Sequence, residues 1–568
     1  MNKFGSAMES FGRKVILILF GMIVFFLAIS SMFGSSFVNH DEYTFFVSDV
    51  PIIHLGVFFS IIIIIFVRNK ISYKFQQKTK KIMWYAFLVI YVLGFATLAI
   101  YLSLEPRADQ KSIVDTAKAM VAGNFDAYKK GGYMYVYPNQ IGIVFFLYCI
   151  FKFFTTSKNI ICILNAIAVG VTAVASNEIA NELKQEKETK SYKTGILTLL
   201  FIPIGFYVPF IYGNLMGMAL SMLSIWFTMK YYNLRKYSHI WLAVITAVIA
   251  MLLKQNFLIP LVGIIVFVLW DIVKQKSKKS VVFLLSLIVV SISLSTALNV
   301  TVESITGEKV SQGVPSLAWV VMGMQEGYMA YGWHNQYNEN VFRNNDCDNE
   351  KTKEVVKRDF YDRINEMATK PVYAVKFYFQ KTISQWNNPT FECFWINDTV
   401  KRTEDGIKVK HVSNVFHGVT GEPANKLLQN YCNIYQSMVL LLTCFWLFFE
   451  YKKISFDQLL LPIIFLGGFI FHLFWEAKCQ YVIPYFVLLF PYAIKGLNCF
   501  VMSVEKMVIG EPSLTMKEKV QKNKRTAFVI VVLLVIAVSS VIVSPVTKKV
   551  FGFTQGAYEQ FLVDESER

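Results

Sequence analysis

Long apolar blocks alternate with polar segments along most of this chain. Each block holds roughly 15–22 residues, a length that crosses a hydrocarbon layer of about 30 Å as an α-helix. The candidate spans lie at 15–34, 51–67, 82–104, 141–155, 159–178, 195–210, 214–232, 239–253, 257–273, 281–299, 433–449, 458–474, 481–498 and 526–545. The pattern therefore predicts an all-α polytopic membrane protein.

The basic residues between the spans predict its orientation. Lys and Arg gather at 13–14, 68–81, 230–236, 274–279, 452–453 and 506–525. Cytoplasmic loops carry an excess of these residues, so we expect the basic segments inside. The segment 35–50 contains Asp41, Glu42 and Asp49 but no Lys or Arg, and we expect it outside together with 105–140.

The segment 181–194 gives conflicting signals. Its basic and acidic residues are Lys184, Lys187, Lys190, Lys193, Glu182, Glu186 and Glu188. The lysines favour the inside, whereas the acids suit an external loop. Counting back from the later loops favours the inside and gives about 13 crossings, or about 14 if every apolar block crosses.

A second long polar segment, 300–432, also falls outside on this topology. Its acids and bases are nearly balanced, which predicts a folded extracytoplasmic loop domain. Within it, the stretch 351–371 has helical spacing, and the helix is expected to end before Pro371. We expect 376–386 to form an amphipathic helix at the membrane interface. The tryptophans of this region, which suit either membrane anchoring or sugar stacking, are Trp319, Trp333, Trp386 and Trp395.

These boundaries divide the chain into five parts. They are N-terminal extra spans at 1–81, a transmembrane core at 82–299 containing the first external loop 105–140, the loop domain 300–432, C-terminal core spans at 433–498, and a basic loop, last span and tail at 499–568. Arg13 and Lys14 precede the first apolar block without a clean cleavage site, so that block is expected to be a retained span.

Composition supports a membrane protein. Hydrophobic residues make up 55% of the 568 residues, charged residues make up 17%, and the mean hydropathy is +0.44. The net charge of +17 would suggest nucleic-acid binding in a soluble protein, but the inside location of the basic loops explains it better. The eight Cys contain no CxxC pair, so neither a zinc site nor a disulfide framework is indicated. Cys347, Cys393 and Cys432 share one loop, so a disulfide between any two of them would leave the third cysteine unpaired.

The first external loop supplies the main catalytic candidate. A helix is expected to start near Ser112, which would place Asp115 in its first turn as a dipole-favoured acid. Asp109 would precede that helix and be free to reach a site, although a solvated loop acid is the simpler interpretation. The loop ends in an aromatic run with Tyr133, Tyr135 and Tyr137.

Polar residues at span ends supply the other candidates. Asn214 opens a span, where it would either cap the helix or face a ligand, and capping is the expected role. Lys254 lies between two apolar blocks on the external side, where it suits an anionic group such as a lipid phosphate or simply snorkels at a turn. Glu476 and Lys478 open a late span, again externally, and the two lysines together would grip a phosphate.

These features resemble the GT-C (C-type fold) membrane glycosyltransferases, which include protein O-mannosyltransferases and the aminoarabinose transferase of lipid A. The shared features are an acid near the start of a long first loop that ends in YPNQIG (137–142), a large late loop, and EAKCQYVIP (476–484) opening a late span. The closest likeness is to Gram-positive members, and it extends to LKQN (253–256) and to 315–338. It covers most of the chain, from about 82 to 498.

The resemblance implies an inverting transferase whose donor is a sugar on a polyprenyl phosphate at the extracytoplasmic face of the cell membrane. Asp109 would be the general base. The resemblance assigns the donor phosphate to Lys254, Glu476, Lys478, Gln480 and Tyr481. It assigns the acceptor wall to Asp115, Tyr133, Tyr135, Tyr137, Pro138 and Asn139. A divalent cation shared by Asp109 and Asp115 is the one cofactor that it suggests.

The chain departs from the family pattern at three positions. Gln110 follows Asp109 where mannosyltransferase-type members have an acidic pair, Gln480 replaces an Arg, and Asn139 replaces a second Pro. These changes bear on the donor and on the acceptor, which is expected to be a glycolipid, glycopolymer or protein of the cell envelope.

Two other functions fit a protein of this class. A flippase for lipid-linked saccharides would place charges along a central path, whereas the unusual charges here gather at the external ends of spans. A polymerase or ligase of cell-wall glycans would share much of the transferase chemistry.

Overall fold

The computed structural model describes residues 3–38, 42–70, 76–183, 190–397, 423–509 and 515–550. It is nearly all-α, with 79% of its residues helical. The N-terminal elements are α1 (Lys3–Phe33), β1 (Gly34–Val38), β2 (Thr44–Ser48), α2 (Pro51–Lys70), α3 (Gln77–Leu102), α4 (Asp109–Val121), η1 (Asp126–Tyr128), α5 (Tyr133–Val136), η2 (Pro138–Gln140), α6 (Ile141–Phe153) and α7 (Asn159–Glu182).

The middle elements are α8 (Lys193–Leu200), α9 (Pro203–Phe206), α10 (Asn214–Leu234), α11 (Tyr237–Leu253), η3 (Gln255–Phe257), α12 (Leu258–Gln275), α13 (Lys278–Thr306), α14 (Ser316–Gly323), α15 (Tyr337–Asn344), α16 (Asn349–Thr369), α17 (Pro371–Trp386) and α18 (Cys393–Asn397). The last are α19 (Pro423–Glu450), η5 (Phe456–Leu459), α20 (Leu460–Phe474), α21 (Cys479–Val487), α22 (Phe490–Val508), α23 (Met516–Lys522) and α24 (Lys524–Val550).

Within the described residues, eight helical segments are long and apolar enough to cross a membrane, or up to nine if the bent pair Asp126–Val136 and Pro138–Phe153 is one span. Two further apolar helices, Tyr237–Leu253 and Leu460–Phe474, are shorter. Only 11% of the apolar stretch of α3 is buried inside the protein, and the same holds for α13. Apolar side chains on such helices face outward, as they do in a membrane-embedded protein.

The predicted spans mostly coincide with helices, but two of them are broken. The block 195–210 forms the short helices α8 and α9, and the block 481–498 is divided between α21 and α22. Pro203 begins α9 and Pro491 lies in the first turn of α22, positions where the missing N–H of proline is tolerated. The acids and lysines at 184–189, on which the prediction for 181–194 partly depends, lie outside the described residues.

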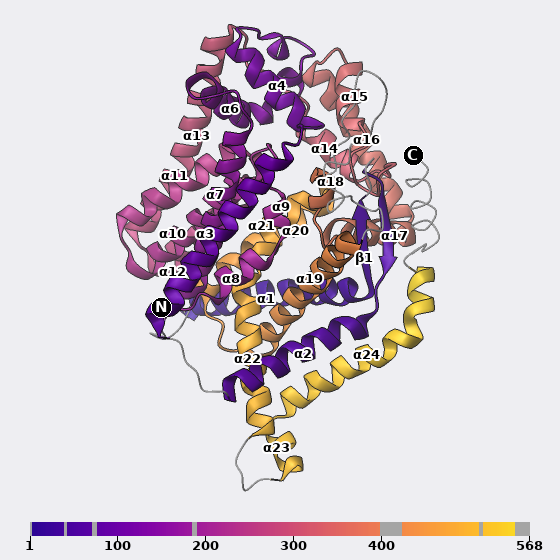
Figure 1. Cartoon of the computed structure of the whole chain (residues 1–568). Helices are drawn as coiled ribbons and strands as arrows, with labels where there is room; N and C mark the ends of the chain where they lie inside the picture. The colour runs from indigo at the N-terminus through magenta and orange to yellow at the C-terminus, as the bar shows by residue number, and fades with distance from the viewer. Residues whose placement is uncertain are drawn as a thin grey trace.

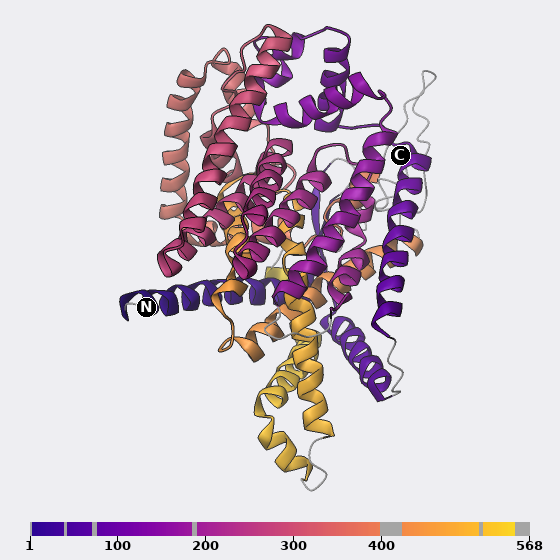
Figure 2. The same ribbon diagram turned by 90° about the vertical axis from the view of Figure 1, so that its left-hand side faces the viewer.

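The first loop and the helices α14 to α16 lie at the same end of the molecule, and α23 lies at the other end (Figures 1 and 2). Two segments separated by most of the transmembrane core in sequence therefore meet. Val314 N donates to Val136 O at 3.2 Å, which joins the chain before α14 to the end of α5.

The segment 35–50, which the charge pattern places outside, contains a structure that the hydrophobic pattern did not predict. β1 and β2 form an antiparallel hairpin in which Gly34 pairs with Ser48. Ser36 N donates to Asn387 O at 2.9 Å, so the hairpin is also tied to the chain that follows α17. The hairpin, with Glu42 shortly before its second strand, therefore lies against the late part of the chain.

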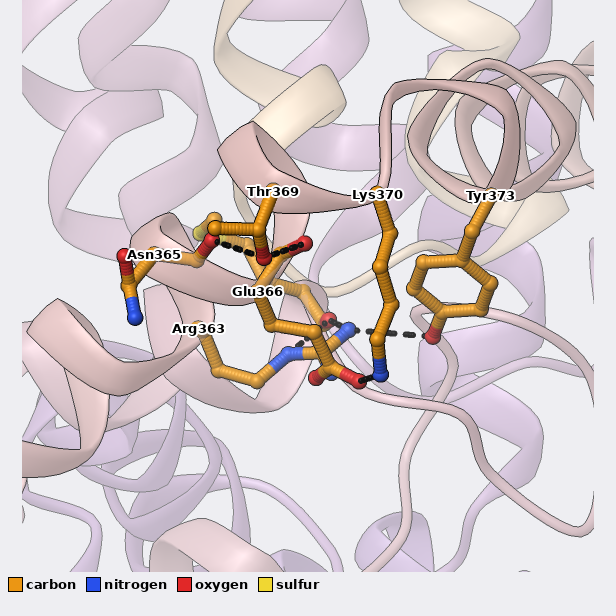
Figure 3. Close-up of polar contacts among 7 residues, drawn as sticks. Arg363, Asn365, Glu366, Thr369, Lys370 and Tyr373 are labelled. Atoms are coloured by element: carbon orange, nitrogen blue, oxygen red, sulfur yellow. Dashed lines mark hydrogen bonds and ion pairs between the residues drawn. The ribbon is translucent and has the colours of Figure 1, made fainter.

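The corner between α16 and α17 contains a group of polar contacts (Figure 3). The predicted helix end before Pro371 is confirmed, because α16 ends at Thr369 and Pro371 begins α17. Glu366 lies between Arg363 and Lys370 and pairs with both, the Lys370 distance being 3.0 Å.

The interfacial prediction for 376–386 is corrected by the packing of α17. Its aromatic residues Phe377 and Trp386 are buried inside the protein, with Trp386 against Phe465 and Phe469. Apolar side chains that were expected to lie in the headgroup region instead form part of the protein core.

Candidate active site

Asp109 is the first residue of α4, so the prediction that the helix starts near Ser112 is wrong. In this place the carboxylate belongs to the first turn, where the helix dipole favours negative charge. Asp115 is exposed and pairs with Lys111 at 2.5 Å. Positions i and i+6 of a helix differ by about 240° in direction, so Asp109 and Asp115 lie on different sides of α4 and are poorly placed to share an ion.

Tyr212, between α9 and α10, is the central partner of Asp109. Its hydroxyl donates to Asp109 Oδ2 at 2.7 Å and accepts from Gln140 Nε2 at 2.7 Å. Burial, and then the charge of Asp109, raises the pKa of Tyr212 well above its ordinary value, so the phenol stays protonated and donates. Gln110 is buried and accepts from Ile211 N at 2.9 Å, which fixes the backbone beside Tyr212.

Lys254 lies between α11 and η3 and contacts the same tyrosine. Its side chain is buried, and its Nζ is 3.2 Å from the centroid of the Tyr212 ring. Burial lowers the pKa of Lys254 to about 7, although the carboxylates of Asp109 and Glu476 act in the opposite direction. Among the described residues no carboxylate forms an ion pair with Lys254. Within this part of the chain, the ammonium thus lies on an aromatic face and forms no direct ion pair.

Glu476 and Lys478 occupy the turn between α20 and α21. A buried lysine, Lys381 of α17, fixes this turn by donating to three carbonyls: Gly323 O, Leu473 O at 2.9 Å and Trp475 O at 2.7 Å. The first two carbonyls belong to the C-terminal ends of α14 and α20, where unpaired carbonyls favour a cation. Lys381 therefore holds α14 and the Glu476 turn together.

Lys478 is surrounded by acids. Its Nζ pairs with Glu42 Oε1 at 2.9 Å, and Glu392 and Glu476 lie close by. Burial alone would lower the pKa of Lys478, but these carboxylates together raise it. Burial also raises the pKa of Glu392 to about 8. Glu392 and its neighbour Phe391 have φ of 64° and 50°, a left-handed conformation that is strained for residues with side chains.

Four aromatic rings from three parts of the chain form what we term the aromatic wall: Tyr133, Tyr137, Trp319 and Trp475. Neighbouring ring centroids are 5.3 Å (Tyr133–Tyr137), 6.0 Å (Tyr137–Trp319) and 5.8 Å (Trp319–Trp475) apart. Both tyrosines interact electrostatically with Asp109, which places the wall beside that carboxylate. The Tyr137 hydroxyl donates to Glu339 Oε2 at 2.7 Å.

Two of the other predicted wall residues, Tyr135 and Pro138, pack against the segment 313–342. Tyr135 stacks on Phe342 at 6.4 Å, within an apolar cluster of the loop domain. Pro138 packs so closely against Gly313 that a Cβ there would overlap its ring, and Gly313 has a φ of 65°. Asn139 is half-buried in η2. Tyr135 and Pro138 therefore join the first loop to the loop domain, whereas Tyr133 and Tyr137 interact with Asp109.

A partly open cleft begins at Lys254. Its polar lining comes from Lys254, Asn214, Asn256, Gln480 and Tyr481, and its apolar lining comes from Leu215, Met218, Phe257, Ile483 and Pro484, with Tyr207. A second, smaller cavity shares Met218 and Pro484 with the cleft and continues along Met222, Ile225 and Leu488. The cleft therefore has a polar mouth and an apolar continuation.

Two contacts shape the mouth of this cleft. Asn214 Nδ2 donates to Gln480 Oε1 at 3.2 Å, and the Asn214 side chain makes no capping bond, so the prediction that it caps α10 is wrong. The Tyr481 hydroxyl donates to Glu476 Oε2 at 3.4 Å. The predicted donor-phosphate residues Lys254, Gln480 and Tyr481 thus line one cleft, with Glu476 next to it, while Lys478 lies on the Glu42 side.

Among the residues of this region that the sequence pattern did not single out are Tyr212, Glu339, Glu392, His334 and Lys381. His334 interacts electrostatically with both Glu339 and Glu476, which places it between the loop domain and the late turn. Glu392 and Lys381 could have been identified from the sequence, because each places a charge within a largely apolar run. Burying a charge is costly, so a charge in such a run indicates a specific role.

Within the described residues, no group of three or more His, Cys, Asp or Glu side chains could hold a metal ion. All eight cysteines lie in the described part of the chain and are free thiols, including Cys347, Cys393 and Cys432. No protein-family model matches the chain, and no curated protein matches it.

Proposed function

We propose that this chain is a membrane glycosyltransferase of the GT-C type, which moves a sugar from a polyprenyl phosphate to an acceptor of the cell envelope at the extracytoplasmic face. The observation that carries this proposal is the convergence on Tyr212 of an acid and a buried cation. Asp109 accepts a hydrogen bond from the hydroxyl of Tyr212, and Lys254 Nζ lies over the ring of the same tyrosine. A base for the acceptor and a cation for the leaving phosphate are thus held by one side chain.

Asp109 acts as the general base. Tyr212 occupies Oδ2, and Oδ1 takes the proton of the acceptor hydroxyl as that oxygen bonds to the anomeric carbon. The bond between the anomeric carbon and the phosphate oxygen breaks at the same time, and its electron pair leaves with the polyprenyl phosphate. Because one displacement occurs at the anomeric carbon, its configuration inverts.

Lys254 stabilises the leaving phosphate. The lysine lines the mouth of the cleft and lacks a carboxylate partner among the described residues, so a phosphodiester there gains an ion pair in a buried setting. The apolar side chains around Met218 and Pro484 form the surface against which the first isoprene units of the donor would lie. Lys478, already paired with Glu42, contributes positive charge near the turn.

The aromatic wall suits the acceptor side. Sugar rings present C–H faces that pack on aromatic rings, and Trp319 and Trp475 are stacked within 8° of parallel. Tyr137 reaches from this wall to Glu339, so the loop domain takes part in the same surface.

The direct test incubates proteoliposomes of the full-length protein with a panel of labelled polyprenyl-phosphate sugars and membrane acceptors. The proposal predicts that one label leaves its lipid and appears on an acceptor with inverted anomeric configuration, releasing polyprenyl phosphate. Movement of intact lipid-linked sugar across the bilayer without bond cleavage would instead identify a flippase. Products that grow by many repeats would identify a glycan polymerase.

A further inference from the structure

A pocket in the loop domain, apart from the cleft, is lined mainly by amide side chains. It has a volume of about 480 Å³ and opens to solvent. Its amides are Gln325, Asn335, Asn340, Asn344 and Asn345. None of the described residues that line it carries a charge, in a domain that is otherwise rich in Lys, Glu and Asp.

The spacing of the lining residues along α15 gives the pocket one helical wall. Tyr337, Asn340, Val341 and Asn344 are at positions i, i+3, i+4 and i+7, and so share one side of the helix. Glu339 and Arg343 lie on the other side.

That other side of α15 binds the first loop. Glu339 accepts from Tyr137 at 2.7 Å, and Arg343 Nη1 donates to Gly131 O at 2.9 Å. One short helix therefore separates the amide pocket from the surface that carries the aromatic wall.

Two of the amides are fixed before any ligand arrives. Asn335 Nδ2 donates to Gln325 Oε1 at 3.0 Å, and Asn335 Oδ1 accepts from Tyr337 N at 3.0 Å. The chain at Gln325 is held as well, because Arg363 at the corner shown in Figure 3 donates to the adjacent Met324 O. A preorganised polar floor reduces the entropy that binding would otherwise cost.

The rim of the pocket carries amides that are available to a ligand. Asn340 and Asn344 are exposed, and within the described residues their side chains make no hydrogen bond. Each amide offers both a donor and an acceptor, the combination that pairs with neighbouring hydroxyl groups. The lack of charge in the lining disfavours ionic ligands, since nothing there would neutralise them.

We infer that this pocket binds a neutral saccharide, a segment of a glycan acceptor beyond the sugar that reacts. The inference rests on the proposed function for its biological meaning, but saccharide binding itself requires neither a donor nor Asp109.

The test measures binding to the full-length protein in nanodiscs by saturation-transfer difference NMR. The probes are neutral tetrasaccharides (maltotetraose, cellotetraose and mannotetraose) and one acidic counterpart, tetragalacturonic acid. At least one neutral probe is expected to bind, and the acidic probe is expected to bind more weakly. The Asn340→Ala/Asn344→Ala variant should bind the neutral probe with an affinity lower by about tenfold or more.

Asn365→Ala is the matched control. Asn365 is an exposed amide of α16 whose side chain points away from the contacts of Arg363 and Lys370 (Figure 3), and its variant should bind as the wild type does. A single Asn344→Asp variant, which keeps the size and adds a charge, should also weaken neutral binding. The inference is overturned if no neutral probe binds, if the acidic probe binds equally well, or if the double variant binds like the wild type.

The two proposals fail separately. Asp109→Asn should bind the tetrasaccharide unchanged, because Asp109 is not part of the pocket. In a transfer assay, the double variant should raise KM for a glycan acceptor and leave kcat unaltered. Saccharide binding without any transfer would contradict the transferase proposal alone.

Discussion

At the scale of single residues, Lys254 is the side chain whose environment most constrains the chemistry. It is buried against Tyr212, and burial lowers its pKa to about 7. A lysine with such a pKa is partly neutral at physiological pH, which removes much of the cost of burying it. A phosphate that binds beside Lys254 would favour the protonated ammonium form of the lysine, so donor binding would be accompanied by uptake of a proton.

This environment predicts a pH dependence for donor binding. The ammonium is present below its pKa and is lost as the pH rises through about 7, whereas a phosphodiester keeps its single charge throughout. Affinity for the polyprenyl-phosphate sugar should therefore fall as the pH rises through this value, as fluorescence-quenching titrations on either side of it would measure.

Two substitutions at Lys254 sharpen this prediction. Lys254→Arg, which stays charged, should flatten the profile, and Lys254→Met should weaken binding by about 10- to 100-fold at low pH. Lys353→Met is the control. It removes an exposed lysine that pairs with Glu350, and it should leave the donor affinity and its pH profile unchanged. A wild-type profile that persists in Lys254→Met would refute the role of Lys254.

Sequence can select candidate residues where a local pattern is sufficient. Asp109 and Lys254 are conspicuous because a charge next to an apolar span needs an explanation, and the structure places both beside Tyr212. Long-range partners cannot be predicted in this way, because Tyr137 and Glu339 are 202 positions apart and meet only through the fold. The pattern predicts a local capping role for Asn214, whereas its amide contacts Gln480 across the cleft.

At the scale of helices and strands, close packing positions the site. α6 crosses the end of α11 at Gly142, where a Cβ would overlap the carbonyl oxygen of Leu252. That crossing lies directly before Lys254, so a shift of α11 would move the lysine away from Tyr212.

Gly142→Ala should therefore lower the stability of the protein by about 1–3 kcal/mol through overpacking. Gly94→Ala, in α3, is the control, because a Cβ on Gly94 would meet nothing within 4 Å. Alanine at this position should raise the stability of the protein by about 0.5–1 kcal/mol through its higher helix propensity. Thermal unfolding in detergent compares the two. Equal melting temperatures for both variants would contradict the packing described at Gly142.

The sequence predicted most helices because apolar runs of sufficient length have few alternatives in a membrane. It did not predict the hairpin of β1 and β2, whose few residues are stabilised by contacts such as that of Ser36 with Asn387. It also assigned α17 to the membrane interface, because an amphipathic pattern does not tell whether protein or lipid covers the apolar face.

At the scale of the whole molecule, the distribution of the loops predicts sidedness. The first loop and α14 to α16 lie at one end, opposite α23 and its basic neighbourhood (Figures 1 and 2). By the positive-inside rule the first end should face away from the cytoplasm.

Cysteine labelling in intact cells checks this orientation, in a background where the native cysteines are replaced by serine. Lys129→Cys, at the exposed end of η1, should react with a membrane-impermeant maleimide without permeabilisation. Lys276→Cys, between α12 and α13, should react only after permeabilisation. The reverse pattern would place the site on the cytoplasmic side.

The central claim is that Asp109 removes the acceptor proton, and one measurement tests it most directly. Polyprenyl phosphate release and donor affinity are measured in proteoliposomes for the wild type, Asp109→Asn and Asp115→Asn. Asp109→Asn should lower the rate by about 10²- to 10⁴-fold while the variant still binds the donor. Asp115→Asn, which removes an exposed ion pair on the same helix, should transfer at the wild-type rate. Transfer by Asp109→Asn at the wild-type rate would contradict the role of Asp109 as the base.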